Sequence, residues 1–155
     1  PFGVPFEITL VGDKPEPVCR RNPGMIYGLG NIVDNAVDFA RSKVTITAQW
    51  TQGAVVLTIA DDGPGFASEV LMRAGEPYLS RSRDKESRAG GGLGLGLFIA
   101  KTLLERSGAV LEFSNLPLPA TGASIRITWL REVFERDDRL LGPSNSELSA
   151  LHATA

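Results

Sequence analysis

Two glycine-rich motifs constrain what this chain can fold into more than any other feature. The first, Asp61-Asp62-Gly63-Pro64-Gly65, directly follows the apolar run Val55 to Ala60, which predicts a strand. The second, Gly92-Leu93-Gly94-Leu95-Gly96, directly precedes an amphipathic pattern from Leu97 to Ser107, which predicts a helix. Glycine permits unusual backbone angles and a close approach of a ligand to the chain. We therefore expect two glycine loops, one after a strand and one before a helix.

A predicted helix upstream of both motifs carries a polar stripe. Asn22 and Pro23 predict its N-terminus, because Asn caps helices and Pro is favoured at the first helical position. Asn31 and Asn35 stand one turn apart, on the same stripe as Tyr27 and Asp38. That stripe faces either solvent or a ligand. The apolar residues, which recur at helical spacing until about Arg41, form the predicted core face: Met25, Ile26, Leu29, Ile32, Val33, Ala36, Val37 and Ala40.

The remaining patterns predict a two-layer α/β sandwich. Phe6 to Val11 alternates apolar and polar residues, so we expect a half-buried strand. Further strands are predicted at Val44–Trp50, Val55–Ala60, Val110–Phe113 and Ser124–Trp129, and short helices at Ala67–Arg73 and Arg131–Leu141. The order is strand, helix, two strands, a long loop, helix, two strands. Two amphipathic helices need a sheet to cover them, which favours two layers.

Size and charge narrow the class of protein. We expect 155 residues to form one domain over residues 1–141, with its core at about 6–130, followed by a loose tail over 142–155. The net charge is −2 and no basic stripe is visible, so we expect no nucleic acid partner. No apolar run approaches the roughly 20 residues that a membrane helix needs, so we expect no membrane contact by this chain. Because it begins with Pro1, we expect it to be part of a longer protein.

The polar residues suit a magnesium–nucleotide site. The amide oxygen of Asn35 is a plausible magnesium ligand beside nucleotide phosphates, and the amide of Asn31 could donate to a phosphate oxygen. The Asp61 carboxylate could accept from an exocyclic amine, which would select adenine. Backbone N–H groups of the second glycine motif could bind phosphate at the start of a helix. Taken singly, each feature is also consistent with a solvated helix face or an exposed turn.

Two common nucleotide-binding folds are excluded by the surroundings of the second glycine motif. No lysine of the Walker type follows it, which excludes a phosphate-loop NTPase. No strand–helix–strand unit surrounds it, which excludes a dinucleotide-binding fold.

Taken together, the motifs resemble the ATP-binding domain of sensor histidine kinases, in the GHKL superfamily, over roughly residues 6 to 130. Asn31, Asn35 and Phe39 match the N box of that family, and the two glycine motifs match its glycine boxes. Pro77-Tyr78-Leu79-Ser80 resembles the F box, and Gly122-Ala123-Ser124 resembles the turn before the final strand. The resemblance implies the Bergerat fold, in which helices cover one face of a mixed sheet. It also implies a flexible ATP lid over residues 77–92.

The resemblance also implies ATP and Mg²⁺ as cofactors. Asn35 would ligate the metal, Asp61 would meet the adenine amine, and Phe39 would lie against the purine, although Phe39 could equally be a core residue. Many family members carry a basic residue where this chain has Asp38, so Arg81, Arg83 or Arg88 could supply the missing charge or form a solvated face. The implied nucleotide contacts are Asn31, Asn35, Phe39, Asp61, Gly63, Gly65, Arg81, Arg83, Gly92, Gly94, Leu95, Gly96 and Ser124.

Asn31 is the residue that distinguishes a kinase from a hydrolase in this superfamily. Related ATPases carry Glu one turn before the magnesium Asn, where a carboxylate can activate water. Asn31 cannot accept a proton at neutral pH, so we assign it a catalytic role in holding ATP for an external nucleophile. In the family that nucleophile is a His on a separate dimerisation domain of the same protein, and a response regulator acts downstream. His152, the single His here, is not expected to be that acceptor.

Three alternatives and one closer resemblance remain. The chain could be a GHKL ATPase, an anti-sigma-type serine kinase or a non-catalytic interaction module. Val37-Asp38-Phe39, Gly75-Glu76-Pro77-Tyr78 and the segment Gly91 to Gly108 resemble the redox-responsive RegB/PrrB sensor kinases of proteobacteria. That resemblance implies the cytoplasmic part of an inner-membrane sensor. Cys19, the single cysteine, is expected to be a buried apolar residue, with a redox role as the alternative.

Overall fold

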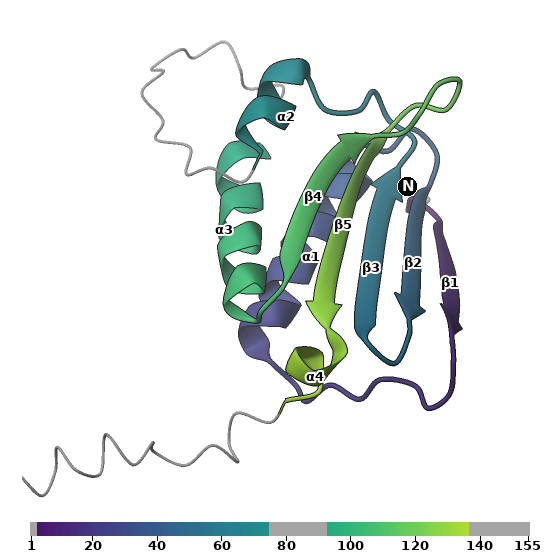
Figure 1. Cartoon of the computed structure of the whole chain (residues 1–155). Helices are drawn as coiled ribbons and strands as arrows, with labels where there is room; N and C mark the ends of the chain where they lie inside the picture. The colour runs from purple at the N-terminus through teal and green to yellow at the C-terminus, as the bar shows by residue number, and fades with distance from the viewer. Residues whose placement is uncertain (1–2, 75–92, 137–155) are drawn as a thin grey trace, which may run out of the picture.

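The computed structural model describes residues 3–74 and 93–136 of the chain (Figure 1). The strands are β1 (Phe6–Gly12), β2 (Val44–Trp50), β3 (Ala54–Asp61), β4 (Val110–Asn115) and β5 (Ala123–Leu130). The helices are α1 (Pro23–Phe39), α2 (Ser68–Arg73), α3 (Leu93–Arg106) and α4 (Arg131–Phe134). This order confirms the predicted succession of strands and helices.

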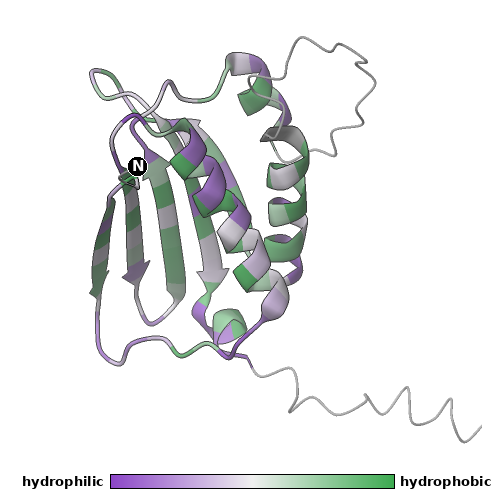
Figure 2. Cartoon of the chain, turned by 180° about the vertical axis from the view of Figure 1, so that it is seen from behind, coloured by the Kyte–Doolittle hydropathy of each residue, from purple (hydrophilic) through white to green (hydrophobic). Residues whose placement is uncertain are grey.

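The five strands form one mixed sheet in the order β1-β2-β3-β5-β4. β1 is parallel to β2, and the other neighbours are antiparallel. Helices α1 and α3 lie against each other on one face of the sheet, over β3, β5 and β4 (Figures 1 and 2). The predicted sandwich, with helices on one face of a mixed sheet, is therefore confirmed.

The core forms between the two long helices and the sheet. Asn22 caps α1, because its Oδ1 accepts a hydrogen bond of 3.1 Å from the Met25 backbone N–H, and Pro23 begins the helix as predicted. Gly28 lets α3 approach α1 closely: a Cβ at this position would lie 3.1 Å from Leu104 Cγ. The largest fully buried side chains are Trp129, Ile32, Leu104, Ile127 and Val44.

Two predictions about burial are wrong. β1 was predicted to be half-buried, but all of its residues are exposed, because it is an edge strand that α1 and α3 do not cover (Figure 2). Register with β2 places Phe6, Ile8 and Leu10 on the helix-bearing face, beyond the reach of the helices. Ile26 was placed on the core face of α1, but it is 52% exposed.

Three predicted helix boundaries also change. α1 ends at Phe39 and not at about Arg41. α3 begins at Leu93, four residues before its predicted start. α4 ends at Phe134, and residues 137–141 of the predicted helix lie outside the described residues, as does the predicted tail 142–155.

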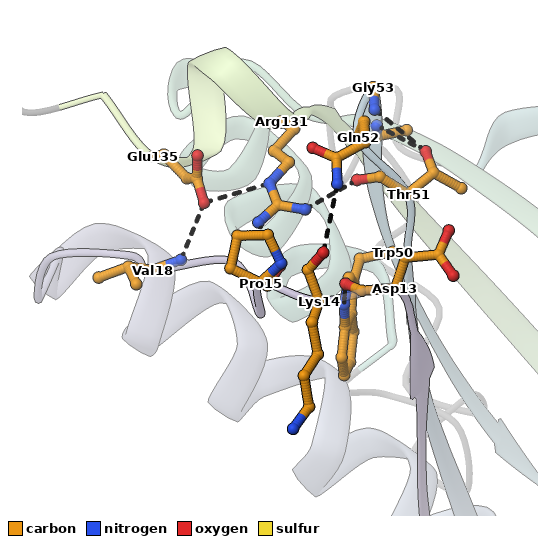
Figure 3. A network of polar contacts seen from close by, with 11 residues as sticks. Asp13, Lys14, Pro15, Val18, Trp50, Thr51, Gln52, Gly53, Arg131 and Glu135 are labelled. Atoms are coloured by element: carbon orange, nitrogen blue, oxygen red, sulfur yellow. Dashed lines mark hydrogen bonds and ion pairs between the residues drawn. The ribbon is translucent and has the colours of Figure 1, made fainter.

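An arginine at the start of α4 joins three segments at one end of the domain (Figure 3). The Arg131 guanidinium donates to the backbone carbonyls of Thr51 (3.0 Å) and Pro15 (2.6 Å), and to Glu135 Oε1 (3.2 Å). Glu135 Oε1 also accepts from the Val18 backbone N–H at 3.1 Å. We call these contacts the Arg131 clasp. They fix the connection between β1 and α1 against the β2–β3 hairpin.

None of the helices in the described ranges is long and apolar enough to cross a membrane.

Candidate functional site

Asp61 lies at the end of β3 that is opposite the Arg131 clasp. Among the described residues, Asp61 and Arg131 are the buried charged side chains, each 6% exposed. Protein acceptors surround the Arg131 guanidinium, whereas the described donors to Asp61 all reach one oxygen. Oδ1 accepts from the backbone N–H groups of Gly63 (2.8 Å) and Ala123 (3.4 Å). The two bonds fix the orientation of the carboxylate, and no described donor reaches Oδ2.

The buried position changes the titration of Asp61. Burial raises the pKa of its carboxyl, and the nearby Asp62 charge adds to this shift. The hydrogen bonds from Gly63 and Ala123 partly oppose it, because they favour the ionised form. A buried carboxylate with a raised pKa and an oriented acceptor oxygen is typical of a binding or catalytic position.

A small pocket opens beside Asp61 on the helix-bearing face of the sheet. Its lining is mostly apolar and includes one amide and one carboxylate: Ile32, Asn35, Ala36, Ile59, Asp61, Phe66, Ala123 and Ile125. The pocket has a volume of about 10 Å³, roughly room for one water, and it combines an apolar lining with convergent polar groups, which is the usual composition of a small-molecule site.

Two glycines close the backbone around this carboxylate. A Cβ at Gly63 would lie 2.0 Å from the carbonyl oxygen of Phe39, at the end of α1. A Cβ at Gly122 would lie 1.8 Å from the carbonyl oxygen of Asp61, and the φ of Gly122 is +132°. Only glycine fits positions where two backbone segments approach this closely. The loop after β3 is therefore held directly against the end of α1 and the start of β5.

The N-box residues lie on α1 as the sequence indicated. Asn31 and Asn35 are half-buried, and neither side chain has a hydrogen bond to another described residue. Asn35 lines the pocket beside Asp61. Phe39 is half-buried and does not belong to the side chains packed on the core. Within residues 3–74 and 93–136, the two amides therefore make no structural hydrogen bonds.

The structure does not bring Ser124 to the pocket. Successive strand residues point to opposite faces of a sheet, and the register pairs Ser124 with Ala60, on the face away from the helices. Ala123 lies on the pocket face and donates its backbone N–H to Asp61. In the pocket, the backbone of Ala123 therefore lies where we expected the side chain of Ser124.

The second glycine motif lies partly inside α3. Gly94, Leu95 and Gly96 belong to the first turn of this helix and not to a loop before it, and Leu95 is 65% exposed. This turn lies at the same end of the domain as Asp61 (Figure 1). Arg81, Arg83, Arg88 and Gly92, the F-box segment 77–80, the lid 77–92 and His152 lie outside the described residues.

Sequence reasoning missed Asn115, at the end of β4. Its Oδ1 accepts from the Phe66 backbone N–H at 2.7 Å, and its Nδ2 donates to the Phe66 carbonyl at 2.9 Å. Gly65, with a φ of +82°, brings the chain close enough for this pairing. Asn115 therefore holds the glycine loop after Asp61 in place. A lone Asn at a strand end carries no local sequence signal for a contact with a distant loop.

We expect Asn115→Ala to destabilise the domain. Both hydrogen bonds to Phe66 are lost, so the free energy of unfolding should fall by about 1–3 kcal/mol. Urea unfolding of the 155-residue chain measures this loss. Ser114→Ala, at an exposed neighbouring position in β4, is the control. If Asn115→Ala lowers the free energy of unfolding no more than Ser114→Ala does, Asn115 does not hold the glycine loop in place.

Asp62 ties the same loop to the connection between α1 and β2. Its Oδ1 accepts from the backbone N–H groups of Arg41 (2.8 Å), Ser42 (2.9 Å) and Lys43 (3.2 Å), and its Oδ2 accepts from the Ser42 hydroxyl. The Ser42 hydroxyl, together with the backbone donors, holds the pKa of Asp62 well below its usual range.

The two adjacent aspartates should give opposite pH dependences of stability. A lowered pKa means that Asp62 stabilises the fold above the ordinary Asp range, near pH 4, and loses this effect as the pH falls toward its folded-state value. Asp61 has a raised pKa, so its contribution is largest at low pH and is lost as the pH rises. In urea unfolding, the stability difference between wild type and Asp62→Ala should shrink from about pH 7 to about pH 3. A constant difference would contradict the assigned hydrogen bonds.

The donor set fits a magnesium ion held together with a nucleotide. Mg²⁺ prefers oxygen ligands, keeps several waters and is usually held by one or two protein groups plus phosphates. The unpaired amide of Asn35 can supply one oxygen. No group of three or more His, Cys, Asp or Glu side chains within residues 3–74 and 93–136 could form a metal site by itself.

Comparison with known proteins identifies relatives of most of the chain. Residues 23–133 match the family model described as histidine kinase-, DNA gyrase B- and HSP90-like ATPase. Sensor histidine kinase RegB of Cereibacter sphaeroides is 44% identical over an alignment of 131 residues that covers 76% of this chain and 28% of RegB. Sensor histidine kinase CpxA of Escherichia coli is 28% identical over an alignment of 135 residues that covers 81% of this chain and 28% of CpxA. The chain thus spans little more than a quarter of these relatives.

Solved structures show the same arrangement of helices and strands. Full-length ShkA in complex with AMPPNP superposes with a TM-score of 0.58 at 27% identity, over 80% of this chain and 25% of ShkA. The mycobacterial sensor histidine kinase MprB gives a TM-score of 0.61 at 24% identity, over 82% of this chain and 83% of the MprB chain.

Proposed function

Because the chain belongs to the histidine kinase-, DNA gyrase B- and HSP90-like ATPase family, we propose that it is the ATP-binding catalytic domain of a two-component sensor histidine kinase. It would transfer the γ-phosphoryl group of ATP to a His on a separate dimerisation domain, and a response regulator would receive the phosphoryl group from there. The observation that carries the proposal is the buried, oriented Asp61 carboxylate in a pocket shared with the Asn35 amide, which has no hydrogen-bond partner among the described residues.

Each pocket residue would have a distinct role. Asp61 Oδ2 would accept from the exocyclic amine of adenine, while Oδ1 stays bonded to Gly63 and Ala123. Asn35 would ligate Mg²⁺, and Phe39 would lie against the purine ring. The bound metal would neutralise phosphate charge, which is the main requirement of phosphoryl transfer.

Asn31 favours transfer over hydrolysis. It lies one turn before Asn35, where a carboxylate would be needed to take a proton from water. An amide has no such capacity, and it would instead orient a phosphate oxygen by donating a hydrogen bond. ATP bound here would remain intact until an external nucleophile approaches.

The test uses two separately purified proteins and labelled ATP. One is the 155-residue chain, and the other is the His-bearing dimerisation domain of the same parent protein. Acid-labile label should appear on the second polypeptide in the presence of Mg²⁺. Rapid multiple-turnover phosphate release by the chain alone would favour an ATPase. Acid-stable label on a serine would favour a serine kinase, and the absence of any nucleotide-induced rise in melting temperature would favour a non-catalytic module.

A further inference from the structure

A second cleft lies at the end of the domain remote from Asp61. It has a volume of about 520 Å³, within the range typical of small-molecule sites. Three segments line it: the chain from Cys19 to Met25, the end of α3 with Ser107 and Gly108, and α4 with Val133, Phe134 and Arg136. We call it the arginine cleft, because Arg20, Arg21, Arg106 and Arg136 all line it.

The walls of the arginine cleft are fixed by hydrogen bonds. The Arg131 clasp holds the chain just before Cys19, through Val18 and Glu135 (Figure 3). The Asn22 cap holds the other end of the same wall. On the opposite wall, Ser107 Oγ accepts from Trp129 Nε1 at 2.9 Å. The backbones that carry the arginines are therefore positioned before any ligand arrives, which lowers the entropic cost of binding.

The cleft has a single sign of charge. Among the described lining residues four are arginines and none is acidic, although the whole chain has a net charge of −2. Arg21, Arg106 and Arg136 are exposed and form no ion pair with any other residue in the described ranges. The C-terminus of α3 adds a partial negative charge of roughly one half, which is small beside the positive charges of Arg21, Arg106 and Arg136. The local field therefore attracts anions.

The rest of the lining restricts the ligand. Met25, Val133 and Phe134 provide an apolar part, and the guanidinium groups can bind phosphate or carboxylate in a bidentate manner. Cys19 is half-buried and its pKa is raised by burial, so its thiol stays neutral and contributes no opposing charge. This finding also favours a structural over a redox role for Cys19.

We propose that the arginine cleft binds a small soluble anion that carries two or more phosphate or carboxylate groups. Several arginines on different walls can each engage a separate anionic group, so a polyanion is favoured over a single phosphate. The site is separate from the nucleotide pocket, and its ligand would bind at the end of the domain remote from Asp61 (Figure 1).

The test is a titration of the isotope-labelled 155-residue chain with pyrophosphate and, separately, with citrate, followed by NMR at about 150 mM salt. The backbone amide signals of Gly24, Ser107 and Gly108 report on the arginine cleft, and that of Gly63 reports on the nucleotide pocket. The cleft signals should shift and saturate with at least one of the two probes. The double substitution Arg21→Ala with Arg106→Ala should weaken this binding by about tenfold or more.

Arg126→Ala is the matched control, because Arg126 is an exposed arginine on the open face of the sheet. It removes the same type of charge and should leave the affinity at the cleft unchanged. An unshifted Gly63 signal in the double variant shows that the fold is intact. The proposal is overturned if neither probe shifts the cleft signals saturably below about 10 mM, or if the control variant weakens binding as much as the double variant.

Discussion

Asp61→Asn should abolish most of the ATP affinity while leaving the fold intact. An amide oxygen in the place of Oδ1 can still accept from Gly63 and Ala123, so the loop after β3 keeps its hydrogen bonds. The amide nitrogen then takes the place of Oδ2 and faces the adenine amine with a second donor. Losing a hydrogen bond to a charged group and leaving donors unmatched should weaken ATP binding by about 100-fold or more.

Isothermal titration with ATP and with GTP measures this effect and its cause. Guanine presents a carbonyl oxygen where adenine presents its amine, so Asp61→Asn should lose less affinity for GTP than for ATP. Asp13→Asn, which makes the same chemical change at an exposed position after β1, at the end of the sheet remote from Asp61, is the control and should bind ATP nearly as wild type does. Equal losses for both nucleotides would show that Asp61 supports the pocket without contacting the base.

Asn35→Ala should remove the magnesium dependence of ATP binding. The substitution deletes the one unpaired amide oxygen that lines the pocket, and Ala is well tolerated inside a helix. The increase in ATP affinity that Mg²⁺ provides should fall by at least about tenfold, since ligand losses of this kind typically cost that much or more. Phosphoryl transfer to the dimerisation domain should fall at least as far.

The decisive measurement is the ratio of ATP affinities with Mg²⁺ and with a chelator. In Asn35→Ala the ratio should approach one, while the affinity without metal changes little. Asp34→Ala, at the exposed preceding position, is the control and should keep the wild-type ratio. If Asn35→Ala lowers the ATP affinity equally with Mg²⁺ and with the chelator, Asn35 contacts the nucleotide and not the metal.

The apolar patterns in the sequence predicted the helices and strands correctly where the sheet and the helices pack against each other. The apolar repeat of α1 and the strands β3, β4 and β5 lie where helices cover the sheet, and their predicted places along the chain are confirmed. The alternation of apolar and polar residues in β1 was misleading, because an apolar residue is buried only if another element covers it. Nothing local indicates how far across a sheet two helices extend, so the exposure of Phe6, Ile8 and Leu10 required the three-dimensional structure.

Only part of the candidate site could be predicted, because some of its contacts depend on the three-dimensional structure. Asn31, Asn35 and Asp61 belong to short motifs whose spacing places them, and the structure brings Asn35 and Asp61 to one pocket. The register places Ser124 on the open face of the sheet and Ala123 on the pocket face, because in a strand a shift of one residue changes the face. Asn115 could not be predicted as part of the site, because its partner, Phe66, is 49 residues away in the sequence. Contacts of that range leave no trace in a single sequence without homologues.

The Arg131 clasp sets a limit on where this domain can be cut. The match to the family model ends at residue 133, but Glu135 is the residue that joins Arg131 to Val18. A fragment that ends at residue 133 would keep the hydrogen bonds of the Arg131 guanidinium to the carbonyls of Thr51 and Pro15. It would lose the Glu135 carboxylate, which balances the charge of Arg131. The natural C-terminal boundary for recombinant work on this domain therefore lies beyond Glu135, and a fused tag or partner is best attached after it.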